Sequence, residues 1–191
     1  MFNQDDLQRL KETNSCPEGN LSEAVLVGAN LEGSDLEGAN LFIAVLKEAN
    51  LQRALLSDAK LELAMLQKAN LREAHLGYAN LSYANMQGTS LQGADLTGAN
   101  LEGANLEGAD LEGANLEGAN LQKAHLEGAN LSYVNLQRAN LDGASLIYAR
   151  TIKTLFGGAR LCNTTMPDGH IEYSGCAYHP FFDEKVESPD E

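Results

Sequence analysis

The chain has 191 residues, of which 43% are hydrophobic and 6% aromatic, and its formal net charge is −14. This length accommodates one domain, and no apolar run approaches the roughly 18 residues that a membrane-spanning helix requires. Such an acidic surface repels nucleic-acid phosphates and anionic lipids, so we expect neither nucleic acid nor membrane as a partner.

Residues 1–20 are predicted to form an N-terminal capping helix and a linker. Asn3 is a suitable N-cap, and acidic residues follow it in the first turn, where they favour a helix. A helix of about residues 4–13 places Leu7 and Leu10 on one face. Pro17 and Gly19 lead out of this segment.

From Leu21 to Leu146 every fifth residue is Leu, with Met86 as the single exception. The residue two positions before each Leu is nearly always Ala, and the residue directly before it is mostly Asn or Asp. The repeating unit is therefore Ala-(Asn/Asp)-Leu-x-x, and Gly often occupies its last position. A fixed period of this kind indicates a repeat architecture.

Neither a helix nor a straight strand gathers these Leu residues into one core. In a helix five residues advance by about 500°, so successive Leu residues circle the axis, and in a strand an odd period sends them to opposite faces. One bend of about 90° per unit closes a square coil of about 20 residues, which stacks on its neighbours at about 4.8 Å. We therefore predict an all-β fold, a quadrilateral β-helix over residues 21–150 whose register continues weakly to about 166.

The last position of each unit lies at the predicted bend. Gly at this corner suits the positive φ of a type II turn. We expect a different turn type where another residue takes the position, as at Glu48, Arg53, Asp58, Tyr78, Tyr83 and Tyr133.

This pattern resembles the pentapeptide-repeat protein family over the length of the repeat. The resemblance implies a right-handed quadrilateral β-helix. Two flanking segments are similar to those of cyanobacterial members: Leu7-Gln8-Arg9-Leu10…Cys16-Pro17 and Cys162-Asn163-Thr164-Thr165-Met166-Pro167-Asp168-Gly169.

Residues 151–180 are predicted to form a small C-terminal cap. Pro167-Asp168-Gly169 is a turn signal between two short segments of strand type, which indicates a hairpin. The acidic tail 181–191 has the composition of a disordered segment, although Phe181 and Phe182 offer apolar groups that dock onto a rod.

Cys162 and Cys176 lie on either side of the predicted hairpin turn. A disulfide between them closes a 15-residue loop, worth about 3 kcal/mol in the entropic account. Two free thiols are the alternative, as expected in a reducing cytoplasm. A zinc site that adds His170 and His179 is a third alternative, with a spacing that fits no familiar zinc motif.

Nothing in the repeat predicts catalysis. A core filled by Leu and Ala leaves no pocket for an acid–base pair or a nucleophile. His75 and His125 lie more than two coils apart, and no catalytic or phosphate-binding motif is present. We therefore expect no enzyme activity, catalytic residue, metal, cofactor or small-molecule substrate.

Residues 20 apart stack in columns, so the sequence maps onto the surface. Apolar residues occupy outward positions in the first coils and form a candidate interaction surface, unless the N-terminal helix or the C-terminal tail covers them: Val25, Phe42, Ile43, Val45, Leu63, Met65 and Tyr83. Acidic residues gather in a later coil as a candidate acidic belt: Glu102, Glu107, Asp110, Glu112, Glu117 and Glu127.

Two functions fit these surfaces. The first is a non-catalytic scaffold that binds an unidentified protein partner through a rod face. The second follows from the resemblance, because members of the family modulate type II topoisomerases such as gyrase by mimicking duplex DNA. Residues 21–150 carry a net charge of −8 over about 31 Å, which is sparser than the one charge per about 1.7 Å of DNA, so we favour the scaffold.

The family's DNA mimics are dimers with larger aromatic residues at central positions, and Phe is absent between Leu46 and Leu155. We therefore expect a monomer. The N-terminus lacks the basic region and apolar core of a signal peptide, so we also expect a cytoplasmic protein unless an export signal precedes Met1.

Overall fold

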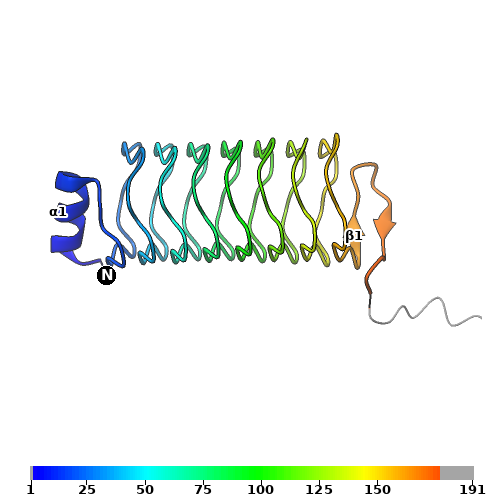
Figure 1. Cartoon of the computed structure of the whole chain (residues 1–191), viewed down its shortest axis with the longest axis horizontal. Helices are drawn as coiled ribbons and strands as arrows, with labels where there is room; N and C mark the ends of the chain where they lie inside the picture. Colours follow the sequence, from blue (N-terminus) through cyan, green and yellow to red (C-terminus); the bar gives the residue numbers. More distant parts are fainter. Residues whose placement is uncertain (1, 177–191) are drawn as a thin grey trace, which may run out of the picture.

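The chain forms a rod of stacked coils (Figure 1), which the computed structural model describes for residues 2–176. One helix, α1 (Gln4–Thr13), lies across the N-terminal end of the rod. Two short strands, β1 (Thr164–Thr165) and β2 (Ile171–Glu172), lie at the opposite end.

Some sequence predictions concern residues beyond Cys176. The acidic tail 181–191, the zinc-ligand candidate His179 and the last residues of the predicted C-terminal cap all lie outside the described residues. Within the part of the chain that the structure describes, no helix is long and apolar enough to cross a membrane.

Backbone hydrogen bonds between successive coils build the rod. Parallel bridges join residues 20 apart, and the ladder runs from Ser15 to Thr165. At the centre of each unit the Leu N–H donates to the carbonyl 19 residues ahead, as from Leu101 to Asn120 over 2.7 Å. At about 4.8 Å per coil the ladder gives a rod about 36 Å long. The molecule is therefore a β-helix solenoid in which single bridges replace long strands.

Leu and the small residue two positions before it fill the interior. From Leu36 to Leu146 every inward side chain is at most 1% exposed. Met86 occupies a Leu position without becoming exposed, and the hydroxyl of the inward Thr89 donates to the Met86 carbonyl over 2.8 Å. Each coil thus buries the same apolar layer, and stacking joins the layers into one core.

The corners show that one sequence expectation was wrong. The last position of each unit has positive φ whether or not it is Gly: φ is 62° at Gly108, 58° at Glu48 and 56° at the β-branched Ile43. A different turn type at the non-Gly corners is therefore excluded. The corner N–H donates to the next coil, as from Ile43 to Glu62 over 3.0 Å. This hydrogen bond fixes the corner backbone at positive φ, although an L-residue prefers negative φ. The left-handed conformation costs an L-residue about 1–2 kcal/mol.

Asn and Asp before Leu stabilise the bend. At each such position from Asn20 to Asn140 the side-chain oxygen accepts a hydrogen bond from the backbone N–H two residues ahead. Several Asn side chains also bond to each other along a column, as Asn120 does to Asn100 over 3.0 Å. These polar groups therefore support the turn within a coil and the contact between coils.

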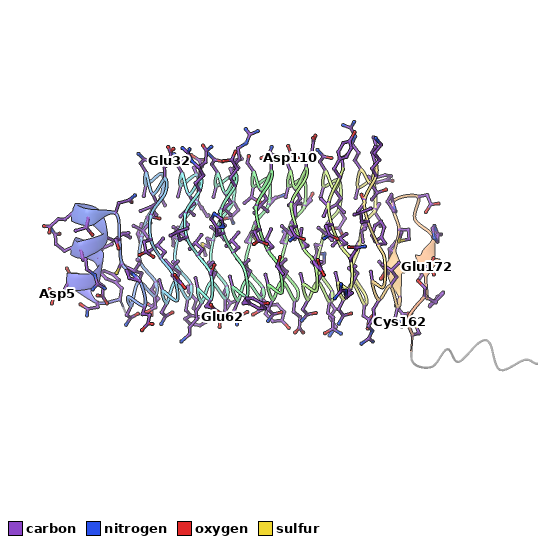
Figure 2. All side chains as sticks on the ribbon, viewed as in Figure 1. Asp5, Glu32, Glu62, Asp110, Cys162 and Glu172 are labelled. Carbon is purple, nitrogen blue, oxygen red and sulfur yellow. A yellow bond between two sulfur atoms is a disulfide. The ribbon has the colours of Figure 1, made fainter. Side chains whose placement is uncertain are left out.

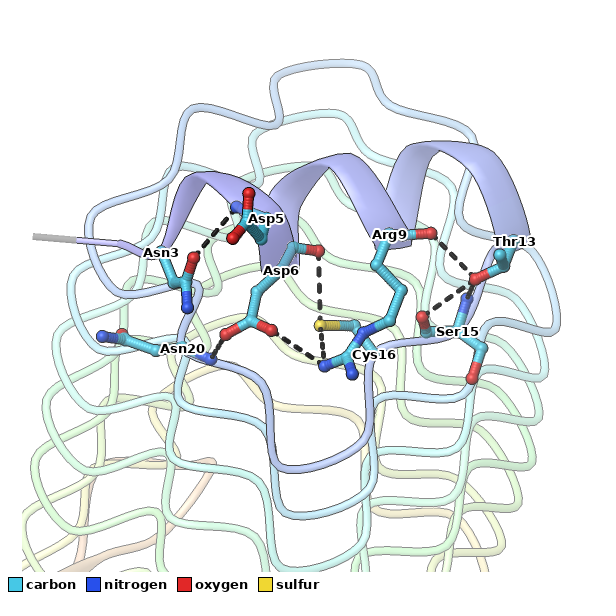
Figure 3. A network of polar contacts seen from close by, with 8 residues as sticks. All are labelled: Asn3, Asp5, Asp6, Arg9, Thr13, Ser15, Cys16 and Asn20. Carbon is cyan, nitrogen blue, oxygen red and sulfur yellow. Dashed lines mark hydrogen bonds and ion pairs between the residues drawn. The ribbon is translucent and has the colours of Figure 1, made fainter.

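Polar contacts and a buried Leu join α1 to the first coil (Figure 3). The Asn3 side chain caps the helix by accepting from the Asp5 N–H, and Leu10 is 2% exposed against the core. Asp6 accepts from the backbone N–H of Asn20 over 2.8 Å and pairs with Arg9 over 2.9 Å. The guanidinium of Arg9 also contacts the Cys16 sulfur, and this contact raises the pKa of Arg9. Cys16 is a buried free thiol.

The C-terminal hairpin forms around the predicted turn. β1 and β2 pair antiparallel, with Thr164 opposite Glu172 and Thr165 opposite Ile171. A disulfide joins Cys162 to Cys176, with Cα atoms 4.8 Å apart. Of the three alternatives that the sequence left open for these cysteines, the structure contains the disulfide.

The shared φ of the corners predicts opposite effects for two substitutions. Gly108→Ala lowers the thermal midpoint by about 2–8 °C, because the new Cβ meets no atom within 4 Å and only the positive φ is penalised. Glu48→Gly raises the midpoint, because Gly relieves the same penalty. Scanning calorimetry measures both, and a Gly108→Ala protein as stable as the wild type would contradict a fixed corner conformation.

The disulfide predicts a stability that depends on redox state. Cys162→Ser/Cys176→Ser lowers the free energy of unfolding by about 3 kcal/mol, because the unfolded chain loses a 15-residue loop closure. Urea unfolding with and without a reductant measures the difference. The reductant destabilises the wild type and leaves the double variant unchanged; an unaffected wild type would refute the bond's contribution.

Candidate interaction surface

The 20-residue spacing brings the seven predicted apolar residues together. Val25, Val45 and Met65 follow one another in a single column, because bridges join Val25 to Val45 and Val45 to Met65. A second column at the preceding corner runs through Ile43, Leu63 and Tyr83, and Phe42 lies beside it. We refer to these seven residues as the apolar patch: Val25, Phe42, Ile43, Val45, Leu63, Met65 and Tyr83.

The apolar patch is open to solvent. Val25 is 71% exposed and Leu63 47%, while Phe42, Met65 and Tyr83 are also exposed and the other two members are half-buried. α1 lies across the end of the rod and leaves this side surface uncovered. Covering by the helix, one alternative from the sequence, is therefore excluded for these side chains.

A groove adjoins the apolar patch at the N-terminal end. The end of α1 with its C-cap (Leu10–Asn14) and the first coil (Val25–Glu32) line a groove of about 570 Å³. Val25 belongs to both the groove and the patch, and Val27, 55% exposed, extends the apolar surface into the groove. Sequence reasoning missed Val27, although its outward position in the unit identifies it as a surface residue.

The backbone at this groove is also an open edge. In later coils the residue before each Leu donates its N–H to the preceding coil, but the first coil has no such neighbour. Within residues 2–176 the amides of Val25 and Asn30 have no backbone acceptor. The groove therefore offers apolar side chains together with free hydrogen-bond donors.

Lysines surround the apolar patch. Lys60 lies on one side of the two columns, and Lys47 and Lys68 lie on the other. None of the three is in an ion pair with a described residue. Arg53, farther around the coil, pairs with Glu32. Glu23, Glu48 and Glu62 occupy the same or adjoining columns, so the rim of the patch carries both signs of charge.

The acidic belt does not concentrate its charge on one face. Glu102, Glu107, Glu112 and Glu117 are spaced five apart, so each lies on a different side of one coil. In Figure 2, Asp110 lies on the edge of the rod opposite Glu62, which stacks on Phe42 beside the patch columns.

Neighbours also contact some carboxylates of the belt, and one of these neighbours, Arg138, is a cation. Glu117 pairs with Arg138 over 3.2 Å, Glu127 lies 3.5 Å from His125, and Glu107 accepts from Gln87 over 3.1 Å.

The remaining polar features are local contacts of the hairpin. The His170 side chain and backbone bond to the Asp168 carboxylate and lower its pKa, and the backbone N–H groups of Ser174 and Tyr173 lower the pKa of Glu172. Asp168 is an exposed residue of the turn, and Glu172 is a half-buried residue of β2. The described residues include no cluster of His, Cys, Asp and Glu that could hold a metal ion. The disulfide removes both thiolates from the predicted zinc ligands.

The comparisons with known proteins concern the repeat. The sequence matches the family model "Pentapeptide repeats" in eight copies over residues 16–41, 44–77, 74–113 and 109–146, more than half of the chain. A comparison with curated proteins found no match.

Three solved structures illustrate the likeness. A pentapeptide repeat protein from the Arabidopsis thaliana thylakoid lumen is 31% identical, with a TM-score of 0.46. The match covers 49% of this chain and 65% of the Arabidopsis chain, so this chain spans less than two thirds of that protein's length. HetL, a pentapeptide repeat protein involved in heterocyst differentiation regulation from Nostoc sp. strain PCC 7120, is 27% identical over 90% and 100% of the two chains, with a TM-score of 0.36. Rfr23 from Cyanothece 51142 is 34% identical over 80% and 97%, with a TM-score of 0.40. All three TM-scores lie below 0.5, so no property of these proteins is carried over to this chain.

Proposed function

Because this chain belongs to the pentapeptide repeat family, we propose that it is a non-catalytic, right-handed, four-sided solenoid that binds a protein partner through the apolar patch. In this proposal α1 and the β1–β2 hairpin serve as end caps. The rod acts as a monomer and takes no cofactor, nucleic acid or small-molecule substrate.

The main observation in support of this proposal is that the apolar patch is exposed to solvent. Large apolar side chains that adjoin on one face are typical of interaction surfaces, whereas single exposed ones are not. Fully burying a Leu, Val, Met or Phe stabilises a complex by about 1.5–3 kcal/mol, so several half-exposed side chains supply several kcal/mol. The charged residues around the patch, which are of both signs, add selectivity for a partner with the complementary arrangement of charges.

The disulfide bears on the compartment. The sequence favours the cytoplasm, where thiols are kept reduced, but a lasting disulfide is typical of an oxidising compartment. Titrating the thiols of protein isolated from native cells distinguishes the cytoplasm from an oxidising compartment. A cytoplasmic protein has all three cysteines free, whereas a protein from an oxidising compartment has only one free thiol.

Comparing two tyrosines tests the patch. Tyr83 and Tyr78 occupy equivalent corners, both with φ of 57°, and each ring lies against a Gly of the next coil. Only Tyr83 belongs to the apolar patch. The two therefore differ in their side of the rod while sharing a local structure.

Photo-crosslinking from position 63 in native extract identifies the partner, and binding is then measured with the purified partner. We expect Leu63→Ser and Tyr83→Ser each to weaken binding about tenfold, corresponding to about 1.4 kcal/mol, and Tyr78→Ser to leave it unchanged. Equal effects of Tyr83→Ser and Tyr78→Ser would refute binding through the patch.

DNA mimicry is the alternative, and the belt geometry disfavours it. Residues 102–127 carry a net charge of −5, but their carboxylates point around the rod and Glu117 is paired with Arg138. Duplex DNA carries one charge per about 1.7 Å along its whole length. We expect no effect in a gyrase supercoiling assay at high micromolar protein. Inhibition that is lost in Glu107→Gln/Glu112→Gln would favour mimicry instead.

A further inference from the structure

The N-terminal end of the rod is covered on only part of its perimeter. Asn3 and Cys16 donate their backbone N–H groups to the carbonyls of Asn20 and Asp35, over 2.8 and 2.7 Å. These bonds cover the sides of the first coil near residues 20 and 35. The two sides over residues 24–31 have no backbone segment paired with them toward α1, within the part of the chain that the structure describes.

The next coil shows which groups a paired segment bonds to. The Val45 N–H donates to the Ala24 carbonyl over 2.9 Å, and the Val45 carbonyl accepts from the Leu26 N–H over 2.8 Å. Two residues on, the Lys47 carbonyl accepts from the Gly28 N–H over 2.9 Å. Three hydrogen bonds therefore join this five-residue unit to the unit stacked on it.

The equivalent groups of the first coil lack these three bonds. They are the N–H and the carbonyl of Val25 and the carbonyl of Val27, and none has a backbone partner in residues 2–176. Both residues are exposed, at 71% and 55%, so added chain reaches this edge. A helix already uses its own backbone groups, whereas an extended segment offers free ones to a sheet edge. The edge therefore selects an extended segment.

The core is also less completely covered beside this edge. Leu26 and Leu31 are 5% and 4% exposed, whereas their counterparts one coil later, Leu46 and Leu51, are 0% and 1% exposed. Ala29, between the first two, is half-buried. A large apolar side chain placed over Leu26 therefore completes a layer that α1 leaves partly open.

The groove at this edge favours an uncharged occupant. Its charged lining residues are Lys11, Glu12 and Glu32, and the carboxylate of Glu32 is paired with Arg53. Lys11 and Glu12 are of opposite sign, so the groove attracts neither an acidic nor a basic segment. Its volume of about 570 Å³ falls within the about 300–1,000 Å³ of ligand sites.

We propose that this groove binds an extended, uncharged segment of the protein partner, which adds to the first coil as one more unit. A carbonyl of the segment accepts from the Val25 N–H, and two of its amides donate to the carbonyls of Val25 and Val27. The residue that bonds to the Val25 carbonyl has a large apolar side chain, which packs on Leu26. Because the groove shares Val25 with the apolar patch, one partner contacts both, and this inference rests on the proposed function.

A peptide taken from the repeat tests the groove on the full chain without the partner. The probe is residues 84–93 with blocked ends, Ala-Asn-Met-Gln-Gly-Thr-Ser-Leu-Gln-Gly, which is uncharged and has an apolar side chain at the required position of each unit. With a dissociation constant of about 1 mM, about 10 mM peptide slows exchange of the Val25 amide about tenfold. The same peptide with N-methyl groups on its Met and Leu amides, which removes the donors and keeps the side chains, leaves this exchange rate unchanged.

Two variants of the protein separate the groove from the patch. Val27→Ser weakens peptide binding about threefold, because the groove loses apolar surface. Leu63→Ser, on the patch, leaves peptide binding unchanged.

Three results would overturn the proposal. They are an unchanged Val25 exchange rate at about 10 mM peptide, equal binding of the methylated and unmethylated peptides, and Val25 protection without peptide that rises with protein concentration. The last result assigns the groove to a second copy of the chain. Failure of the peptide refutes the groove alone, since the comparison of Tyr83→Ser with Tyr78→Ser decides the patch independently.

Discussion

The backbone hydrogen bonds between successive coils set the 20-residue register on which the rest of this rod depends. Each unit donates to the next coil at its Leu and at its corner, so the backbone has one conformation per position in the unit. The corner shows how strongly this acts, because even Ile43 adopts a positive φ there. The inward Leu and Ala supply the apolar burial that stabilises the stack, but the bonds decide which way each side chain points.

The same register determines how the surface is organised. Residues 20 apart adjoin, whereas residues five apart lie on different sides. Apolar residues spread over three coils, such as Val25 and Met65, therefore form one continuous patch. Acidic residues that are close in sequence, such as Glu107 and Glu112, are separated around the rod. Side chains of one kind therefore form a continuous surface only when they are 20 residues apart. The patch residues meet this condition and the belt residues do not, so the patch is the better candidate for binding.

The two ends of the rod differ from its middle because each lacks a neighbouring coil. α1 joins the first coil through Leu10 and the Asp6–Arg9–Cys16 contacts, and leaves Val25 and Val27 beside a groove. The hairpin and the disulfide cover half of the last coil. Open backbone and apolar groups therefore concentrate at the ends, and interactions beyond the repeat become favourable there.

The sequence by itself determined the features that depend on local pattern. The fivefold spacing of Leu defined the coil and its inward side, and Asn3 and the Pro167-Asp168-Gly169 turn located the helix and the hairpin. Only the tertiary structure decided features that join distant segments. The bonds to the next coil fixed the non-Gly corners, which local turn preference predicted wrongly. The sequence left the pairing of Cys162 with Cys176 as one of three alternatives and gave no sign of the groove between α1 and Val27, because both depend on how the end segments fold back on the rod.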